Sequence, residues 1–291
     1  MRKLSNDDKA KIAAFATIFF WSSSFMFIKI ALNYYDSMTL SVLRYIISSF
    51  VLIFYMIMKK MRMPELKDIP IFFCSGFTGF ALYMITLNKG LTTLSSSTVS
   101  VIMAFAPILT SVLSVIFLKE KINLYGWICI FVSFAGIAVL MLWEGVLSVN
   151  EGVFLILTSA LLLAIYNIIQ KKLMRRYTAS EATTYSIFTG TILLVLYSPK
   201  SAMEIFHMSS AGFIIVFYLA VFVGVVGYIL WSKALSLAEN TGEIANLLFL
   251  NPFIATIMGI IILHEKLTIP TIIGGTMILS GILGYNKFKG K

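Results

Sequence analysis

Charged residues are scarce in this chain. Of its 291 residues only 12% are Asp, Glu, Lys or Arg, whereas 59% are hydrophobic. A soluble domain carries about 25% charged residues, so this composition excludes an ordinary water-soluble protein. Apolar runs of about 20 residues, the length that crosses a bilayer as a helix, recur along nearly the whole sequence. Because backbone polar groups in lipid must bond within their own segment, these runs predict helices.

Residues typical of catalytic and metal-binding chemistry are also few. The two cysteines, Cys74 and Cys129, both fall inside apolar runs, which argues against a disulfide framework. The two histidines, His207 and His264, lie in loops and have no metal-ligand spacing to cysteines or carboxylates. The sequence also lacks a Gly-rich phosphate-binding loop and a Ser–His triad. We therefore predict a protein that is not an enzyme, does not use ATP directly and needs no cofactor or metal.

The apolar runs predict an all-α integral membrane protein with ten transmembrane helices. The predicted spans are Ala10–Leu32, Met38–Met58, Ile69–Leu87, Thr98–Leu118, Ile122–Leu142, Gly152–Ile169, Thr178–Tyr197, Ala211–Leu230, Gly242–Leu263 and Ile269–Tyr285. Most of the 23 Lys and Arg residues lie at the termini and in the loops that ten spans would place on the same side of the membrane as the termini. Only Lys89, Lys200 and Lys266 lie in loops on the opposite side. Cytoplasmic loops carry such an excess, so we predict a multi-pass protein of the plasma (inner) membrane with both termini cytoplasmic. The basic loops would contact anionic lipid rather than nucleic acid.

The chain is internally repeated. Pro107 and Pro252 are 145 residues apart, and at the same offset the Leu-Lys-Glu-Lys that begins at Leu118 matches the Leu-His-Glu-Lys that begins at Leu263. Repetition in an apolar sequence is typical of transporters, and we predict two halves, residues 1–145 and 146–291. Each half holds five spans, an odd number, so the second half would enter the membrane inverted. A central cavity is expected between them.

Several motifs carry a family resemblance. They are Trp21-Ser22-Ser23-Ser24-Phe25, Arg44, Ala106-Pro107 through Leu118-Lys119-Glu120, Asn251-Pro252 through Leu263-His264-Glu265, and Gly274-Gly275 to Gly281. On these residues the chain resembles an EamA-type ten-helix member of the drug/metabolite transporter superfamily. The resemblance covers both halves. It implies two five-helix repeats around a central cavity and transport of small metabolites, commonly outward.

The two mid-span prolines are candidate hinges. Proline removes a helical hydrogen bond and kinks the helix, and such breaks at membrane depth are tolerated where they line a cavity. Pro107 and Pro252 are therefore predicted to be hinges in spans that line the substrate site. The alternative is a plain packing kink.

Polar and aromatic side chains within the spans are candidates for contact with a substrate. The set is Trp21, Ser24, Phe25, Phe80, Tyr83, Ser100, Phe105, Tyr166, Asn167, Gln170, Tyr228, Trp231, Asn246, Phe249 and Asn251. It predicts a pocket with aromatic walls and few charges, suited to an amphipathic or aromatic solute. For each aromatic residue the alternative is an anchor that faces lipid.

Ionisable residues inside spans are costly and should face protein or water. Arg44 would either attract an anionic group of the substrate, or serve as a structural residue that bonds to carbonyls or extends to the outer membrane surface. Glu243 would either cap its helix or couple transport to protons. Lys29 is expected to extend to the membrane surface, and Glu265 to make a structural contact across its own short turn.

Together these features predict a secondary transporter that moves a small organic metabolite by alternating access. An amino acid or drug-like solute is the favoured cargo and export the favoured direction. An importer of a vitamin or amino acid, or a lipid-type flippase, are the alternatives. The predicted partners are a small-molecule substrate and the lipid bilayer. The sequence leaves both a monomer and a homodimer open.

Overall fold

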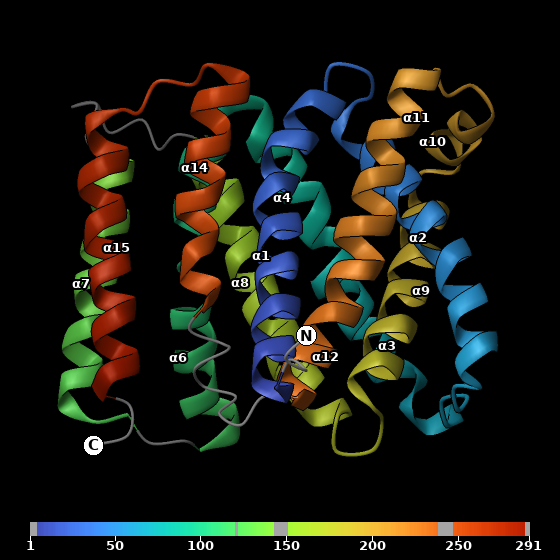
Figure 1. Cartoon of the computed structure of the whole chain (residues 1–291), viewed down its shortest axis with the longest axis horizontal. Helices are drawn as coiled ribbons and strands as arrows, with labels where there is room; N and C mark the ends of the chain where they lie inside the picture. The colour runs from blue at the N-terminus through green and yellow to red at the C-terminus, as the bar shows by residue number, and fades with distance from the viewer. Residues whose placement is uncertain (1–4, 120–121, 143–150, 238–246, 289–291) are drawn as a thin grey trace.

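The computed structural model describes residues 5–119, 122–142, 151–237 and 247–288, and these ranges form a bundle of helices without a strand (Figure 1). The helices are α1 (Asn6–Ala31), α2 (Ser37–Lys59), α3 (Ile69–Gly76), α4 (Leu82–Thr93), α5 (Ser96–Met103), α6 (Ala106–Leu118), α7 (Leu124–Leu142), α8 (Glu151–Leu173), α9 (Ala179–Tyr197), α10 (Pro199–Met203), α11 (Ser210–Phe217), α12 (Gly227–Leu237), α14 (Leu250–Leu263) and α15 (Ile269–Phe288). π-Helical turns join α3 to α4 (Phe77–Ala81) and α11 to α12 (Tyr218–Val226).

Within the part of the chain that the structure describes, six helical runs are long and apolar enough to cross a membrane, judged by length and composition. They are Asp8–Ala31, Ser37–Lys59, Leu66–Thr93, Ser96–Phe117, Glu151–Leu173 and Ser210–Trp231. Shorter apolar helices cover Leu124–Val139, Leu250–Leu263 and Ile269–Tyr285. The chain is therefore a multi-pass membrane protein. Helices cover most of the described residues of the predicted spans, with exceptions at 32, 104–105, 122–123 and 178, while residues 242–246 of the ninth predicted span lie outside the described residues.

Local sequence signals fix where the helices begin and end. Ser5 and Thr178 each start a helix with a reciprocal capping box, in which the side chain three residues later, Asp8 or Glu181, bonds back to the cap. Helices α6 and α14 are followed by Lys119 and His264 in the left-handed conformation, with φ of 57° and 53°. These two residues are 145 apart. The repeated motif therefore gives the same backbone turn in both halves.

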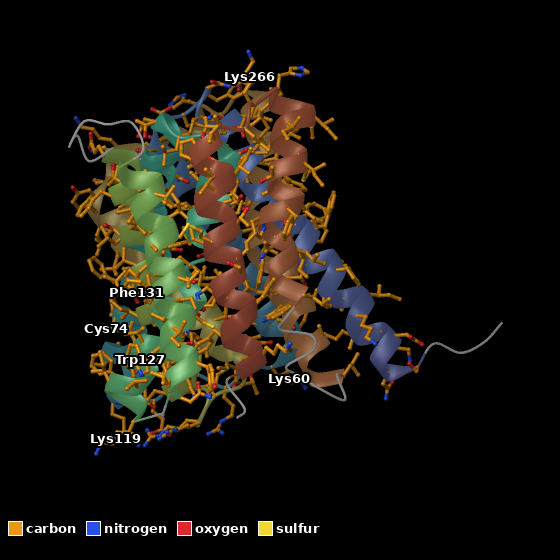
Figure 2. All side chains as sticks on the ribbon, turned by 90° about the vertical axis from the view of Figure 1, so that its left-hand side faces the viewer. Lys60, Cys74, Lys119, Trp127, Phe131 and Lys266 are labelled. Atoms are coloured by element: carbon orange, nitrogen blue, oxygen red, sulfur yellow. The ribbon has the colours of Figure 1, made fainter. Side chains whose placement is uncertain are left out.

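The surface and the interior divide as expected for a protein in lipid. Phe131 and Trp127 on α7 are 75% and 45% exposed and point away from the bundle (Figure 2). Buried positions include many Ser and Thr residues, whose hydroxyls bond to backbone carbonyls or to one another. Figure 2 also places Lys60 and Lys119 toward one end of the bundle and Lys266 at the other. We refer to these as the Lys119 end and the Lys266 end.

Contacts between helices join the two halves of the chain. Helix α1 packs on α12 and α14, α4 and α6 pack on α8, and α2 packs on α9 and on the Tyr218–Val226 turn. Helices α7 and α15 lie together at one edge of the molecule (Figure 1). The core is thus built from both halves rather than from each half alone.

Candidate functional site

A cluster of aromatic rings lies in the core between the halves. Phe80 is fully buried, and its ring meets the rings of Tyr45 at 5.5 Å, Tyr166 at 5.2 Å and Tyr228 at 6.3 Å between centroids. Trp21 meets Tyr228 at 5.3 Å and Trp231 at 5.6 Å. We call these six residues the aromatic cluster. Sequence reasoning named five of them and missed Tyr45.

Glycine allows these rings to approach the backbone. A Cβ atom added at Gly79 would lie 2.2 Å from the ring of Tyr166, and one at Gly227 would lie 2.8 Å from the indole nitrogen of Trp21. The same indole N–H donates to the carbonyl of Val223 at 3.3 Å, inside the π-helical turn. A π-helix changes which carbonyls are bonded within the helix, which suits this contact with a side chain.

Arg44 on α2 lies beside the aromatic cluster. The residue is 5% exposed, its guanidinium carbon is 5.7 Å from the centroid of the Tyr45 ring, and Nη1 is 3.5 Å from the sulfur of Met84. Its Nε is buried and has no hydrogen-bond partner among the residues that the structure describes. Arg44 is thus a buried cation within the same site.

A small pocket of about 10 Å³, room for about one water molecule, lies next to this cluster, between α2, α9, the Tyr218–Val226 turn and the start of α12. Tyr55, Thr183, Thr184 and Tyr228 are among the residues that line it. Of the predicted substrate contacts only Tyr228 belongs to this lining. The hydroxyls of α9 were not singled out from the sequence, because Ser and Thr are frequent in the buried parts of most spans.

The other predicted contacts are distributed over several environments. Gln170 is buried and donates to the hydroxyls of Ser75 and Ser186. Asn167 is exposed and donates to Thr110, and the Asn251 amide oxygen accepts from Ser22. Among the remaining described members, Phe25 and Tyr83 are half-buried, and Phe105 packs on Phe134. The hydroxyl of Ser24 donates to the carbonyl of Trp21, and the hydroxyl of Ser100 donates to the carbonyl of Ser97. Glu243 and Asn246 lie outside the described residues, as does the side chain of Phe249.

The two candidate hinge prolines both stand at breaks between helical segments. Helix α5 ends at Met103 and α6 starts at Ala106, so Pro107 lies in the first turn of a new helix. A short 3-10 turn, Leu247–Phe249, precedes α14 and Pro252. Proline is favoured at such starts because its missing N–H would have no helical partner there. Their surroundings differ, since Pro252 is buried and Pro107 is exposed.

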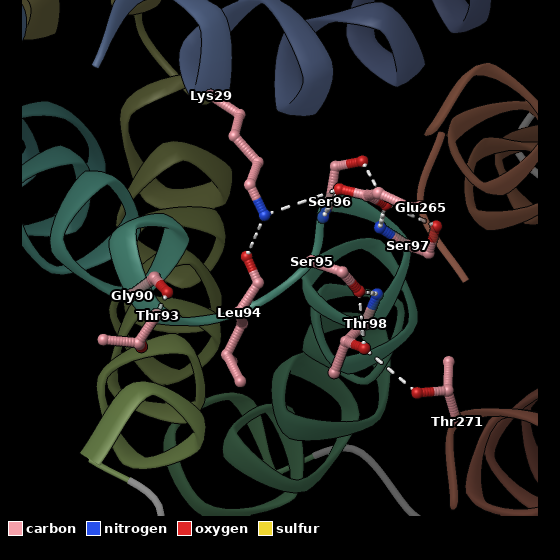
Figure 3. A network of polar contacts seen from close by, with 10 residues as sticks. All are labelled: Lys29, Gly90, Thr93, Leu94, Ser95, Ser96, Ser97, Thr98, Glu265 and Thr271. Atoms are coloured by element: carbon pink, nitrogen blue, oxygen red, sulfur yellow. Dashed lines mark hydrogen bonds and ion pairs between the residues drawn. The ribbon is translucent and has the colours of Figure 1, made fainter. Parts of the chain in front are cut away.

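A polar network ties the two halves together at the Lys266 end (Figure 3). The carboxylate of Glu265 accepts four hydrogen bonds, from the backbone N–H and the hydroxyl of both Ser96 and Ser97, at 2.8–3.2 Å. The ammonium of Lys29 lies 3.5 Å from the same carboxylate and donates to the carbonyl of Leu94 at 2.9 Å. We call Lys29, Leu94, Ser96, Ser97 and Glu265 the Glu265 cluster.

These contacts correct two expectations. The backbone N–H of Glu265 donates to the carbonyl of Gly259 within its own turn, but the carboxylate binds the first residues of α5, up to 169 residues away, where the helix dipole favours a negative charge. Lys29 is not simply extended to the surface, because it pairs with Glu265. Burial would raise the pKa of the Glu265 carboxyl, but the hydrogen bonds from Ser96 and Ser97 outweigh it and hold the pKa below its ordinary value. The sequence signals that pointed here were the repeated Glu and the run of hydroxyl residues that opens α5.

The Lys119 end has its own links between the halves. Asp68 accepts from Arg176 at 3.2 Å and from the Tyr177 hydroxyl at 2.8 Å. Glu181 caps the start of α9 and also accepts from the backbone N–H of Arg62 at 3.0 Å. These contacts join the loop after α2 to the loop before α9.

The bundle of apolar helices around a buried aromatic and cationic site defines a membrane transporter rather than an enzyme. The model of the EamA-like transporter family matches residues 8–142 and 150–287. The chain belongs to this family. As predicted, it is a member of a family of transporters and not an enzyme.

Named relatives agree with this assignment. The chain is 29% identical to an "Uncharacterized transporter YdfC" of Bacillus subtilis (strain 168), covering 90% of this chain and 86% of that one. It is 26% identical to a "Probable terminal-alkyne amino-acid exporter" of Streptantibioticus cattleyicolor, covering 96% and 94%. One solved structure has a TM-score of 0.63 at 15% identity and covers 96% of both chains, which shows a shared fold.

Proposed function

We propose that this protein is a secondary transporter that moves a small organic metabolite across the plasma membrane by alternating access. The observation that carries the proposal is the way the halves pack. Contacts between a helix of the first half and a helix of the second half have counterparts in which the two halves have swapped roles. A chain with this symmetry has two equivalent closed arrangements, one for each side of the membrane. Family membership supports transport as the activity.

The paired contacts support two inverted repeats, residues 1–145 and 146–291. Helix α1 of the first span packs on α12 of the eighth, and α8 of the sixth span packs on α4 of the third. The pairing of α1 with α14 is matched in the same way by that of α8 with α6. A twofold axis in the membrane plane would produce this pattern.

The glycines of α7 and α15 support the same symmetry at atomic scale. A Cβ at Gly136 would lie 2.7 Å from the carbonyl oxygen of Gly274, and one at Gly281 would lie 2.6 Å from that of Cys129. Both glycines and both carbonyl residues are 145 apart. Such reciprocal contacts are what a twofold interface requires.

In this proposal the Lys266 end faces outward and the Glu265 cluster closes it. Lys60 and Lys119 at the opposite end then face the cytoplasm, as the excess of basic residues there favours (Figure 2). The Glu265 carboxylate joins α1, α5 and the end of α14, which belong to different halves. An outward-open state would have to break these bonds.

The aromatic cluster and Arg44 form the proposed substrate chamber, with the helix starts at Pro107 and Pro252 as hinges. An amino acid or drug-like solute fits walls made of Trp, Tyr and Phe with one buried cation. The relative named as an amino-acid exporter favours an amino acid as cargo and export as direction. Import of a vitamin or amino acid, and lipid flipping, remain the alternatives that the experiment must separate.

The test is flux into liposomes that contain the purified protein, with solutes chosen by metabolite profiling of overexpressing cells. We expect saturable flux of at least one amphipathic solute. Tyr228→Ala should reduce it at least about tenfold, which corresponds to the loss of about 1.4 kcal/mol of binding free energy. Phe131→Ala, on the exposed face of α7, is the matched control and should keep the original rate. Equal loss in both variants, or flux of labelled lipid alone, would contradict the proposal.

A further inference from the structure

Arg44 carries a positive charge in the membrane-spanning part of α2 without a visible counter-ion. Within the described residues no carboxylate forms an ion pair with it. A charged side chain at such depth is expensive and is retained where it pairs or serves a function.

The groups around the guanidinium do not satisfy it. An arginine has five N–H donors in a planar fork, and here one of them faces a thioether sulfur at 3.5 Å while Nε has no partner. The face of the Tyr45 ring gives a cation–π contact at 5.7 Å. A buried donor without an acceptor is costly, so the fork is arranged for an acceptor that comes from outside the chain.

The surroundings restrict what that acceptor is. The guanidinium carbon lies over the Tyr45 ring at 5.7 Å, and the ring of Phe80 connects Tyr45 to Tyr228. An apolar aromatic wall beside one cation suits a solute with one anionic group and an apolar body. A single guanidinium neutralises a carboxylate, whereas a phosphate dianion would leave a net negative charge in the bundle. Arginine also matches a carboxylate with two parallel hydrogen bonds.

We propose that Arg44 binds the carboxylate of the transported solute, and that its apolar part rests on Phe80 and Tyr228. This inference rests on the proposed transport function and narrows it to amphipathic carboxylates, amino acids among them. Arg44 is then a substrate-binding residue, and its charge is balanced only when a solute is bound.

The first test compares acids with their amides. Phenylalanine with phenylalaninamide, and leucine with leucinamide, are offered to the protein in liposomes, with binding followed by thermal shift and transport by flux. We expect the acid forms to bind at least tenfold more tightly than the amides, and Arg44→Met to abolish the difference. Arg175→Met, an exposed arginine, is the control and should keep it. A preference that survives Arg44→Met would overturn the inference.

The thermal midpoint of Arg44→Met without solute separates binding from structure. Removal of an unpaired buried charge should leave the midpoint unchanged or raise it, because methionine packs well beside Met84. The inference would be overturned if Arg44→Met lowers the midpoint strongly while the conservative Arg44→Lys keeps the preference for acids over amides. That result would show that Arg44 has a structural role.

A second test supplies the carboxylate from the chain itself. Met84→Glu places a carboxylate where the solute would bind, so it should raise the thermal midpoint and remove the stabilisation by acid solutes. In the Arg44→Met background the same change should lower the midpoint. Destabilisation in both backgrounds would overturn the site. Binding of acids without any flux would leave the Arg44 site intact and contradict the transport function. Equal flux of acids and amides would leave the transport function intact and contradict the Arg44 site.

Discussion

At the scale of single residues, Glu265 has the most consequential environment. Its side chain is 8% exposed, and it accepts four hydrogen bonds from the start of α5 while Lys29 lies beside it. The carboxylate charge is therefore matched on several sides. In the proposed transporter this one side chain sets how firmly the outer end is closed.

We expect Glu265→Gln to weaken the closed state. The amide keeps the size of the side chain but loses the charge that strengthens its hydrogen bonds, which are worth about 1.5–3 kcal/mol when one partner is charged. The thermal midpoint should fall and labelling from the outer side should rise. Glu204→Gln, an exposed glutamate at the same end, is the control and should change neither. A midpoint equal to that of the unchanged protein would contradict this assignment.

The pH dependence follows from the direction of the pKa shift. The folded pKa of Glu265 lies below its ordinary value of 4.5, so the closed state gains from ionisation above 4.5 and loses that gain as pH falls through the folded pKa. Lys29 is the charged group that faces this carboxylate. The difference in thermal midpoint between the unchanged protein and Glu265→Gln should be constant from about pH 6 to 8 and vanish in stronger acid. A difference that changes near neutral pH would show that Glu265 titrates there.

Gly259 is the residue that makes room for this carboxylate. A Cβ there would lie 2.6 Å from Oε2 of Glu265 and 2.8 Å and 2.9 Å from the hydroxyls of Ser96 and Ser97. Gly259→Ala should therefore displace the carboxylate and increase outer-side labelling as Glu265→Gln does. The control is Gly275→Ala, whose Cβ would meet a valine side chain at 3.2 Å and should be tolerated. Wild-type labelling in Gly259→Ala would contradict the packing described.

At the scale of helices, the third and eighth predicted spans each contain a π-helical turn. Phe77–Ala81 shifted by 145 residues falls within Tyr218–Val226. Both turns carry glycines that approach distant helices, Gly79 against Tyr166 and Gly224 against Ser48. π-Helical turns are frequent at functional sites, and these two flank the aromatic cluster.

Gly79→Ala tests the role of the first turn. Its Cβ would lie 2.2 Å from the Tyr166 ring, and overpacking of this kind costs about 1–3 kcal/mol. We expect a lower thermal midpoint and a loss of substrate binding, measured by thermal shift with the best solute. Gly79→Ala together with Tyr166→Ala should recover much of the stability, because the ring that clashes is gone. No recovery would show that the turn itself, not the ring, requires glycine.

The sequence could predict which segments are helices. Hydropathy located apolar helical segments, while the capping boxes at Ser5 and Thr178 that start α1 and α9 were found only in the structure. The π-helical turns could not be predicted, because they depend on how Tyr166 and Trp21 from other helices pack against Gly79 and Gly227. The contact of Glu265 with Ser96 was missed for the same reason, since it joins residues 169 apart.

At the scale of the whole molecule, the predicted helical membrane class and transporter family are confirmed. The count of ten spans, the inverted repeats and the orientation stay predictions. The opposite positions of Lys119 and Lys266 in Figure 2 and the exchangeable contacts of α1 and α8 support them. The partners of Arg44 could not be derived from the sequence. The spacing of residues along α2 does not show that Met84 and Tyr45 surround the guanidinium without supplying acceptors for all its N–H groups.

The most direct measurement of the central claim is access to the chamber from the outer side. A single cysteine replaces Ser24, next to the aromatic cluster, in a background with Cys74→Ser and Cys129→Ala, and a membrane-impermeant thiol reagent is added from outside. The account predicts slow labelling in this protein and labelling at least about tenfold faster when Glu265→Gln is added, because about 1.4 kcal/mol of closure is lost. Equal outer labelling rates with and without Glu265→Gln would contradict it.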